Sequence, residues 1–422
     1  MQNKQRTHFN ALAWSLMVLA MTSLLAGVAL FRHPLLAQGT MPDGTTQAGK
    51  IFLPLVQYRQ ALNAWRLGFN VINSPLTRYA DVNSLNAGWY ADWIVNPAPP
   101  TPGDIEYVQT IRVHQRLACG LRYHSDRVAC PYAQPLDYVY APNAETILAT
   151  ATARPGSLWL IGNEMDRRDW AYCIRWEGSF CAEVGYSGQD EMLPDSYAVA
   201  FHELATLVRS ADPTAKIGVG GVIQATPLRL TYLSMVWDAY QARYGEPMPV
   251  DVWNVHNFIL QEEHNNWGAD VPPGSNAQFG EYVGNTLLHL DLTIFDRQVR
   301  AFRQWMKERG EQEKPLIVSE YGVLYRNDTM GLPADDPTAV YTFMLASFDY
   351  FAKTRDCSLG FTADDCRLVQ RWNWFSLDDN GDGFNPYGRL VNPNGAGLSV
   401  TGEHFREYVR TNLRELATRA YE

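Results

Sequence analysis

The stretch Ser157–Glu164 (SLWLIGNE) decides the fold, because it joins a continuous apolar segment to a polar end. Its four apolar residues, Leu158–Ile161, form a run that is typical of a parallel strand buried on both faces. A carboxylate directly after such a strand, here Glu164, is costly to bury unless it faces a polar cavity. The stretch therefore predicts a parallel strand whose carboxyl end opens on a polar site.

Similar apolar segments recur along the chain and alternate with amphipathic ones. The predicted strands cover residues 84–93, 107–114, 157–163, 216–223, 250–260, 315–322 and 368–377. The predicted helices cover residues 143–153, 195–210, 226–244, 292–309, 337–354 and 402–418. Such alternation predicts an α/β fold with a parallel sheet. With an eighth, weaker strand near 136–140, the elements would close into a (β/α)8 TIM barrel, which we predict as a single catalytic domain over residues 51–422.

An open doubly wound sheet is the alternative arrangement of the same elements. Such a sheet usually has a glycine-rich nucleotide-binding turn after an early strand. Here Gly218, Gly220 and Gly221 come late in the chain and lack the GxGxxG spacing. The barrel is therefore the favoured prediction.

The N-terminal segment has the pattern of an export signal. Lys4 and Arg6 precede an uncharged, largely apolar run over residues 10–31, which is typical of a secretory signal peptide. The run also has about the ~20 residues that span a bilayer, so a retained anchor is an alternative, as is a buried core helix. We predict a signal peptide or single-pass membrane anchor over residues 1–37 and a polar linker over residues 38–50, with the domain secreted or anchored outside the cytoplasm.

The six cysteines fall into pairs that are close in sequence: Cys119 with Cys130, Cys173 with Cys181, and Cys357 with Cys366. Six thiols allow 15 pairings, but the short separations and the export signal favour three local disulfides. A zinc site is the alternative, although the sequence contains no CxxC spacing.

Composition and missing motifs exclude several classes of function. The 45 Asp and Glu residues outnumber the 35 Lys and Arg residues and give a formal net charge of −10, so a nucleic-acid partner is not expected. No GxSxG elbow occurs, and His202-Glu203 lacks the second histidine of a zincin helix. Aromatic residues make up 12% of the chain, which suits stacking against sugars and equally suits a large core. No cofactor is expected.

The segment 315–322 (PLIVSEYG) is a second apolar strand that runs into a carboxylate, Glu320. The carboxyl ends of barrel strands line one rim, so Glu164 and Glu320 are expected to face each other. Retaining glycoside hydrolysis needs such a pair about 5–5.5 Å apart, with one carboxyl protonated and the other ionised. Taken singly, either residue could equally form a strand-end salt bridge or cap a helix.

Several short motifs together resemble a known group of enzymes. Asn163-Glu164, Ser319–Gly322 and Trp372–Trp374 look like the corresponding motifs of the clan A retaining (β/α)8 glycosidases. More narrowly, Gly88–Tyr90 together with Leu160–Glu164 is similar to the glycosyl-hydrolase catalytic-core family, which contains β-1,3-glucanases. The resemblance extends from residue 84 to about residue 410.

The resemblance implies a role for each matching residue. Glu164 would be the general acid/base and Glu320 the nucleophile, so Glu164 would need a raised pKa and Glu320 a normal or lowered one. Asn163 would bind the sugar hydroxyl next to the anomeric centre, and Trp374 would stack beneath the sugar at the scissile bond. The narrower family commonly has proline after the Asn-Glu pair, whereas Met165 follows here, so the substrate subclass stays open.

Further candidates flank the pair. His256 is expected near the mouth, where it could donate a hydrogen bond to the nucleophile or to a sugar hydroxyl, with a satisfied core histidine as the alternative. Arg112 would lower the pKa of Glu320 if its charge lay beside that carboxyl, with structural pairing as the alternative. Trp89 could line a flanking subsite or belong to the core. The other aromatic candidates for flanking subsites are Tyr90, Trp93, Trp170 and Trp176.

The loop Asp378–Gly383 (DDNGDG) resembles the start of a calcium loop. Position twelve is Arg389, however, where an EF-hand requires a glutamate. We therefore expect a polar loop and no metal site.

These patterns predict an exported retaining glycoside hydrolase that cleaves a β-linked polysaccharide or oligosaccharide by double displacement. A carbohydrate substrate is the expected partner, and single-pass membrane anchorage is possible through the N-terminal segment. A non-catalytic carbohydrate-binding barrel at the cell surface and a transglycosylase are the alternatives.

Overall fold

The computed structural model describes residues 62–421 apart from 74, 125, 178–179, 187 and 380–382, and it leaves out most side chains between 171 and 186. The predicted signal or anchor over 1–37 and the predicted linker over 38–50 lie outside the described residues. In the part of the chain that is described, no helix is both long and apolar enough to cross a bilayer.

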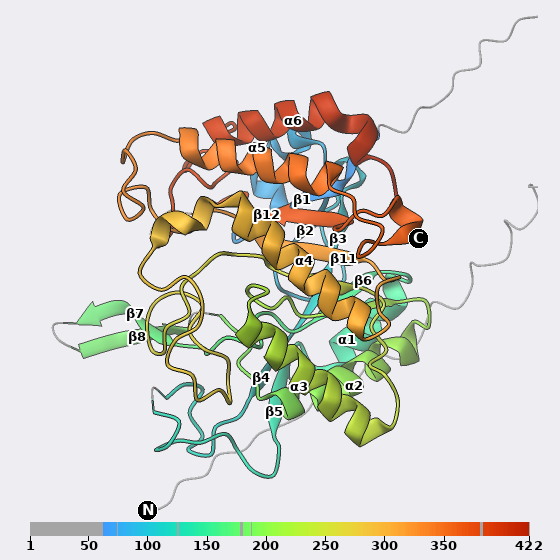
Figure 1. Cartoon of the computed structure of the whole chain (residues 1–422), viewed down its shortest axis with the longest axis vertical. Coiled ribbons are helices and arrows are strands. Elements are labelled where there is room, and N and C mark those ends of the chain that lie inside the picture. Colours follow the sequence, from blue (N-terminus) through green and yellow to red (C-terminus); the bar gives the residue numbers. More distant parts are fainter. Residues whose placement is uncertain are drawn as a thin grey trace, which may run out of the picture. The chain divides into compact units, whose positions relative to one another are not determined.

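Strands and helices alternate along the described chain (Figure 1). The strands are β1 (Ala64–Asn70), β2 (Ala87–Ala91), β3 (Glu106–Tyr107), β4 (Gln109–Gln115), β5 (Tyr138–Ala141), β6 (Leu158–Ile161), β7 (Ala171–Glu177), β8 (Phe180–Tyr186), β9 (Lys216–Val219), β10 (Trp253–Val255), β11 (Leu316–Tyr321) and β12 (Arg371–Trp374). The helices are α1 (Ala144–Ala153), α2 (Pro194–Ala211), α3 (Pro227–Tyr244), α4 (Leu292–Glu308), α5 (Thr338–Lys353) and α6 (Val400–Leu416). Short 3₁₀ helices are η1 (Leu76–Arg78), η2 (Val82–Leu85), η3 (Pro102–Asp104), η4 (Thr286–Leu290) and η5 (Thr362–Asp364).

The helices lie where the sequence predicts them, with ends that differ by two residues at most. Local signals explain the ends. The side chains of Asn143, Asp291 and Ser399 accept hydrogen bonds from the first-turn N–H groups of α1, α4 and α6. Gly245, with φ +73°, ends α3 in the left-handed conformation that favours glycine.

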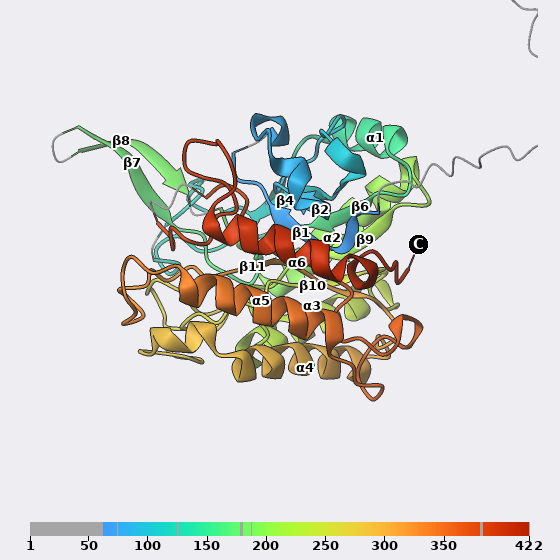
Figure 2. The same cartoon turned by 90° about the horizontal axis from the view of Figure 1, so that it is seen from above.

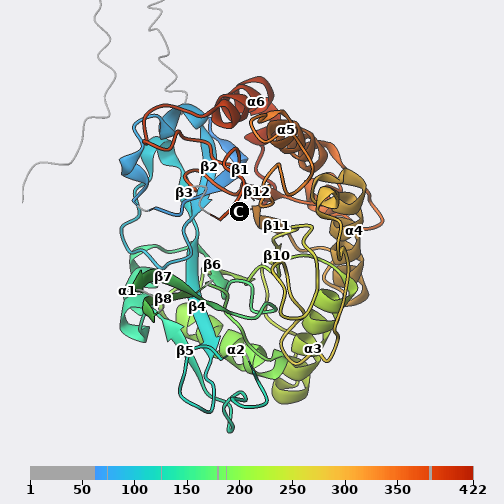
Figure 3. The same cartoon turned by 90° about the vertical axis from the view of Figure 1, so that its left-hand side faces the viewer.

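The strands pair mainly in parallel. One sheet has the order β10-β11-β12-β1-β2-β3 and another the order β5-β4-β6-β9, and β4 with β5 is the one antiparallel pair in these two sheets. Parallel bridges between Gly218 and Val252 and between Val222 and Val255 connect β9 with β10. In Figure 3, α2 to α6 follow one another around the outside of the strands. The fold is therefore a parallel α/β fold, as predicted.

The prediction of an eighth parallel strand near 136–140 is wrong, because β5 pairs antiparallel with β4 and is largely exposed. The additional parallel strand is β1, between β12 and β2. Its sequence, AWRLGFN, contains Arg66 and Gly68 inside a fully buried strand, so it does not read as apolar. The Nη2 atom of Arg66 lies 2.6 Å from Oδ1 of Asp364, and the charge is thus buried as an ion pair.

Apolar side chains fill both sides of the strands. Between strands and helices, Phe348 and Phe351 of α5 contact Trp372 of β12. A smaller cluster lies on the opposite side of the strands and consists of Trp89, Ala91, Val108, Leu158, Leu160, Val252 and Ile317. This interior cluster combines residues of both sheets, so both sheets face a common interior.

Two of the predicted disulfides are present among the described residues. Cys119 bonds to Cys130 and Cys357 to Cys366, with Cα–Cα distances of 5.5 Å and 4.7 Å. The predicted pair Cys173–Cys181 belongs to side chains outside the described set. It lies in the antiparallel β7–β8 hairpin, which projects away from the strands and helices in Figure 2.

The loop after β12 is tied to the end of β1 by Asp378. Its carboxylate accepts hydrogen bonds from the backbone N–H groups of Ile72 and Asn73 at 2.7 and 2.8 Å, and from the Tyr79 hydroxyl at 2.6 Å. Residues 380–382 of the predicted polar loop lie outside the described residues. Asp378 thus serves to join two chain segments.

Candidate active site

Glu164 follows β6 in a turn that leaves the strand sharply. Gly162 has φ +87°, and Glu164 has φ +51°, in the left-handed region that residues other than glycine rarely adopt. The N–H of Glu164 donates to the carbonyl of Gly221 at 3.0 Å, which holds the turn in place. Such a conformation costs about 1–3 kcal/mol and persists where the surrounding structure imposes it, often at functional sites.

Glu320 lies near the end of β11, where the strand carries an extra residue. Val318 pairs with Trp372 and Tyr321 with Trp374, so β11 advances three residues while β12 advances two. Val318 packs against the helices. If the side chains of β11 alternated strictly, the side chain of Glu320, two residues later, would also point toward the helices. The extra residue re-aims the Glu320 side chain toward the interior, as β-bulges often do next to active sites.

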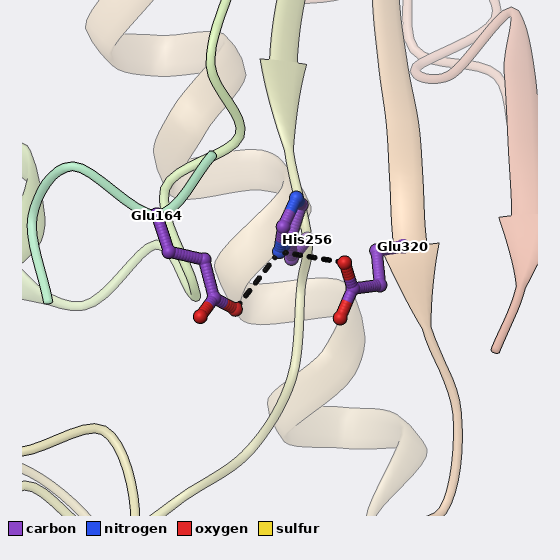
Figure 4. Close-up of side chains that lie close together, drawn as sticks. All are labelled: Glu164, His256 and Glu320. Atoms are coloured by element: carbon purple, nitrogen blue, oxygen red, sulfur yellow. Dashed lines mark hydrogen bonds and ion pairs between the residues drawn. The ribbon is translucent and has the colours of Figure 1, made fainter. Parts of the chain in front are cut away.

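His256 stands between the two carboxylates. It follows β10, is 1% exposed, and places Nδ1 3.0 Å from Oε1 of Glu164 and 3.7 Å from Oε2 of Glu320 (Figure 4). One nitrogen of His256 and one carboxylate oxygen each of Glu164 and Glu320 all lie within 4.8 Å of one another. The structure thus brings together three of the residues that the sequence singled out.

Glu164 is surrounded by hydrogen-bond donors. Its Oε2 accepts from Nη1 of Arg167 at 3.1 Å and from Nε2 of Gln189 at 3.0 Å, while Oε1 faces His256. Burial alone would raise the pKa of Glu164, but the charge of Arg167 and the contacts with His256 and Gln189 lower it to about 2. Glu164 is therefore ionised at neutral pH.

Glu320 has a poorer set of donors. Within the described residues its carboxylate accepts one side-chain hydrogen bond, from Nε1 of Trp93 at 3.1 Å. Burial, together with the charge of Glu164, raises the pKa of Glu320 to about 7, against the lowering effects of His256 and Trp93. Glu320 therefore holds a proton for part of the time at neutral pH.

This distribution of protons is the opposite of the expectation from the family resemblance, which requires a raised pKa at Glu164 and a normal or lowered one at Glu320. The reason is the uneven supply of donors, because Arg167 and Gln189 both point at Glu164. Burial alone would lower the pKa of His256, but the charges of Glu320 and Glu164 raise it above its ordinary value.

The other residues that surround the pair were only partly anticipated. Trp93, named as an aromatic candidate, donates directly to Glu320, and its ring lies 6.1 Å from that of Phe375. Arg167, Gln189 and Phe375 were missed. Phe375 carries a signal that could have been used, since it is the next residue after the predicted Trp374 and alternation places it on the opposite face.

Trp374 does not reach the site. It is 0% exposed, its Nε1 donates to the carbonyl of Gly388 at 2.7 Å, and its ring packs against Tyr321 and Phe348 on the helix side of β12. The predicted stacking position is therefore not available to Trp374. The physical reason is the alternation of β12, which turns Trp372 and Trp374 toward the helices.

Trp89 also lies away from the carboxylates. Its ring is 0% exposed in the interior cluster, and Nε1 donates to the carbonyl of Arg66 at 3.3 Å. Trp93 lies beyond the end of β2 and reaches Glu320 instead. The predicted subsite role of Trp89 is thus replaced by a role in filling the interior.

Arg112 pairs with Asp190, not with Glu320. Its Nη2 lies 2.6 Å from Oδ1 of Asp190, whose Oδ2 accepts the backbone N–H of Asn163 at 2.8 Å. Arg112 and Asp190 therefore support the turn that carries Glu164. The Asn163 side chain is beside Glu164 in sequence and makes no hydrogen bond within the described residues, so its amide can meet a ligand.

The three central residues could also hold a metal ion, since Glu164, His256 and Glu320 each offer one ligand atom. The Arg167 guanidinium, 3.1 Å from Oε2 of Glu164, brings a positive charge to the same place. A cation would have to compete with that charge for Glu164.

No family model matches the sequence, and no curated protein matches it. Solved structures with a similar backbone fold include a GH128 (subgroup II) endo-beta-1,3-glucanase from Sorangium cellulosum. The two chains are 13% identical with a TM-score of 0.45, and the match covers 81% of this chain and 98% of that one. A glucosidase from Croceicoccus marinus has 13% identity and a TM-score of 0.44 over 83% of this chain and 68% of that one. Xylanase 10B from Thermotoga petrophila has 11% identity and a TM-score of 0.41 over 82% and 94%. Such distant likenesses assign no activity to this chain.

Proposed function

We propose that this protein is a retaining glycoside hydrolase that acts on a β-linked polysaccharide or oligosaccharide. The observation that supports the proposal is the meeting of Glu164, His256 and Glu320, whose nearest ligand atoms lie within 4.8 Å of one another. Retaining glycosidases hold their carboxyl groups about 5–5.5 Å apart, whereas inverting enzymes keep them about 6.5–9.5 Å apart to admit a water. The 4.8 Å bound joins the nearest oxygens and not the carboxyl groups as wholes; it is compatible with the shorter separation, from which we infer double displacement.

We also propose that the strands form a closed (β/α)8 barrel. In support, parallel neighbours run from β1 through β2 and β3, continue in β4, β6 and β9, and return through β10, β11 and β12 to β1. The interior cluster corresponds to the layers of side chains that fill such a barrel. Closure would bring the carboxyl ends of β6, β10 and β11 to one rim.

In the proposed reaction, Glu320 attacks the anomeric carbon as the bond to the leaving sugar breaks, and Glu164 gives its proton to the leaving oxygen. A water then loses a proton to Glu164 while its oxygen bonds to the anomeric carbon, and the Glu320 carboxylate departs. The resemblance to the clan A glycosidase motifs implies these roles. His256 acts as a positioning residue between the carboxylates, and Asn163 binds the neighbouring hydroxyl.

Substrate binding has to redistribute the proton in this scheme. Arg167 and Gln189 occupy Oε2 of Glu164, where a leaving oxygen would bind. Removal of the Arg167 contact would take away the cation that lowers the pKa of Glu164. The proton would then pass from Glu320 to Glu164, which leaves Glu320 ionised for attack.

Mechanism-based labelling tests the proposal. A 2-deoxy-2-fluoro β-glycoside should trap a glycosyl-enzyme, and peptide mass analysis should locate the sugar on Glu320. A label on Glu164 would reverse the two roles and keep the covalent mechanism. Products of inverted configuration in an NMR time course, without any label, would overturn the retaining mechanism.

A non-catalytic carbohydrate-binding protein is the second candidate. The burial of the carboxylates favours it, because Glu164 is 3% exposed and Glu320 9%. Saturable binding of sugars without product across a polysaccharide panel would support the binder. A transglycosylase would transfer the sugar to an added acceptor in the same assay.

We further propose that the chain is exported and either secreted or anchored by residues 1–37. The two local disulfides among the described residues support an oxidising compartment. Cell fractionation with N-terminal mass analysis should find the protein outside the cytoplasm and distinguish a cleaved signal from a retained anchor. Recovery from the cytoplasm with reduced cysteines would contradict export.

A further inference from the structure

A cavity of about 350 Å³ lies beside Glu164, between the segments that follow β4, β6 and β10. We call it the arginine cavity. It is lined by Tyr123, His124, Arg127, Arg167, Arg168, Asp169, Trp170, Asn265, Asn266, Gly268 and Asp270. Three guanidinium groups thus face one space, in a chain whose net charge is −10.

The arginine cavity is one side chain away from Glu164. Arg167 lines the cavity and places Nη1 3.1 Å from Oε2 of Glu164. Its Nη2 donates to the carbonyl of Gly268, which also lines the cavity. A sugar bound across Glu164 would therefore have its neighbouring group at this cavity.

Two of the three arginines are already paired. Arg127 donates from Nε to Oε1 of the fully buried Glu191 at 2.8 Å, and Arg167 is paired with Glu164. Arg168 differs. Its Nε is buried without a hydrogen-bond partner, and within the described residues its guanidinium makes no ion pair.

The acidic residues of the cavity do not compensate Arg168. Asp169 is 1% exposed and lies 3.3 Å from Nε of Arg122. Oδ1 of Asp270 accepts the backbone N–H groups of Asn265 at 3.3 Å and Val271 at 2.6 Å. These carboxylates are therefore engaged elsewhere, and Arg168 keeps a positive charge that nothing in the described chain neutralises.

A buried N–H without a partner costs about 1–3 kcal/mol, a cost that a ligand oxygen can remove. A guanidinium matches the two oxygens of a carboxylate or of a sulfate ester, and the charge makes such hydrogen bonds stronger than neutral ones. Trp170, which is 37% exposed, and Tyr123 add aromatic faces to the same cavity. The cavity thus combines stacking surfaces with an uncompensated cation.

We propose that the arginine cavity binds an anionic group, a carboxylate or a sulfate ester, on the sugar next to the cleaved bond, with Arg168 as the principal contact. This inference rests on the proposed glycoside hydrolase function and names its substrate class: a β-linked glycan that carries acidic sugars. Arg168 then determines specificity, whereas Glu164 and Glu320 perform the chemistry.

Matched oligosaccharides test the proposal. β-1,3- and β-1,4-linked glucose oligomers are compared with their C6-carboxylate and C6-sulfate counterparts, which differ in the anionic group alone. We expect wild-type kcat/KM to be at least ~10-fold higher for one of the anionic series, which corresponds to about 1.4 kcal/mol. Arg168→Gln should abolish that preference, raise KM for the anionic oligomer and leave turnover of the neutral oligomer unchanged. The two anionic series identify whether carboxylate or sulfate is the group bound.

Arg410→Gln is the control, because it removes one positive charge from an exposed ion pair with Glu407 on α6. Equal losses in Arg168→Gln and Arg410→Gln, or equal turnover of neutral and anionic oligomers by the wild type, would overturn the proposal. Calorimetric binding of the same oligomers separates this inference from the proposed function. Anionic binding that is lost in Arg168→Gln supports the cavity even if no oligomer is hydrolysed, whereas hydrolysis without charge preference contradicts the cavity alone.

Discussion

Trp93 donates a hydrogen bond from Nε1 to Oε2 of Glu320 at 3.1 Å, across 227 positions of sequence. The tryptophan follows β2 and the glutamate lies in β11, so the contact joins the ends of two strands that are separated in the sheet by β1 and β12. Because Glu320 accepts no other side-chain hydrogen bond within the described residues, this bond orients the carboxylate and favours its ionised form.

Trp93→Phe should raise the pKa of Glu320, since the indole N–H stabilises the ionised carboxylate. In the wild type, kcat/KM should fall as pH rises through the Glu320 pKa of about 7, because the free enzyme then loses the proton that passes to Glu164 when substrate binds. The variant should show that fall at higher pH and should therefore keep a larger share of its activity above pH 7 than the wild type does. Trp305→Phe, which loses a bond to Ser234 on the outside of the fold, is the control. An unchanged pH profile would contradict the role of Trp93.

Glu164→Gln and Glu320→Gln should each lower kcat by at least ~10³-fold on β-linked glucan oligomers, because either change removes one member of the proton and nucleophile pair. Circular dichroism and thermal melting check that both variants fold. Near-normal rates in either variant would show that the carboxylate takes no part in catalysis.

The same two variants should differ in the pH dependence of stability. Burial raises the pKa of Glu320 from 4.5 to about 7, so the folded protein binds more protons than the unfolded chain, and stability falls as pH rises through this window. Glu320→Gln removes that loss, and its Tm should increase relative to wild type between about pH 5 and pH 8. Glu164 has a pKa lowered from 4.5 to about 2, so its contribution is present above pH 4.5 and is lost as pH falls toward 2. Glu164→Gln should therefore lower Tm at neutral pH. Tm differences that are independent of pH would contradict both assignments.

Gly221→Ala should displace His256 from the carboxylates. A Cβ at this position would lie 2.2 Å from Cδ2 and 2.4 Å from Nε2 of His256, so the ring must move. We expect the variant to lose about 1–3 kcal/mol in the free energy of unfolding. For substrates whose kcat/KM is limited by the binding step, kcat should fall more than kcat/KM. Gly383→Ala is the control, because no atom of the described chain lies within 4 Å of its added Cβ. Retention of full activity in Gly221→Ala would show that the position of His256 is not required.

Asp364→Asn should destabilise the fold without altering the chemistry. Both oxygens of Asp364 bond to the fully buried Arg66, at 2.6 and 2.8 Å, and the variant leaves that cation without its full partner. The expected loss is about 3–5 kcal/mol in the free energy of unfolding, measured with denaturant. The kcat of the folded fraction should remain that of the wild type, and a specific loss of kcat would contradict a purely structural role.

Local sequence pattern was sufficient for much of the fold. Continuous apolar runs such as Leu158–Ile161 mark buried parallel strands, and amphipathic runs with capping residues such as Asn143 mark helices, because both signals depend on neighbours in sequence. The strand β1 escaped notice because Arg66 breaks its apolar pattern. Its burial depends on Asp364, a partner that lies 298 positions away in the sequence.

For the candidate site, too, some features could be predicted from the sequence and others depend on the tertiary structure. The sequence by itself placed Glu164, Glu320 and His256 at strand ends, since each follows or ends an apolar run. Tertiary structure alone decided that a bulge in β11 turns Glu320 inward, that Trp374 faces the helices, and that the donors gather on Glu164. Strand register and charge state depend on groups brought together from distant parts of the chain, and the pattern within one segment contains no information about them.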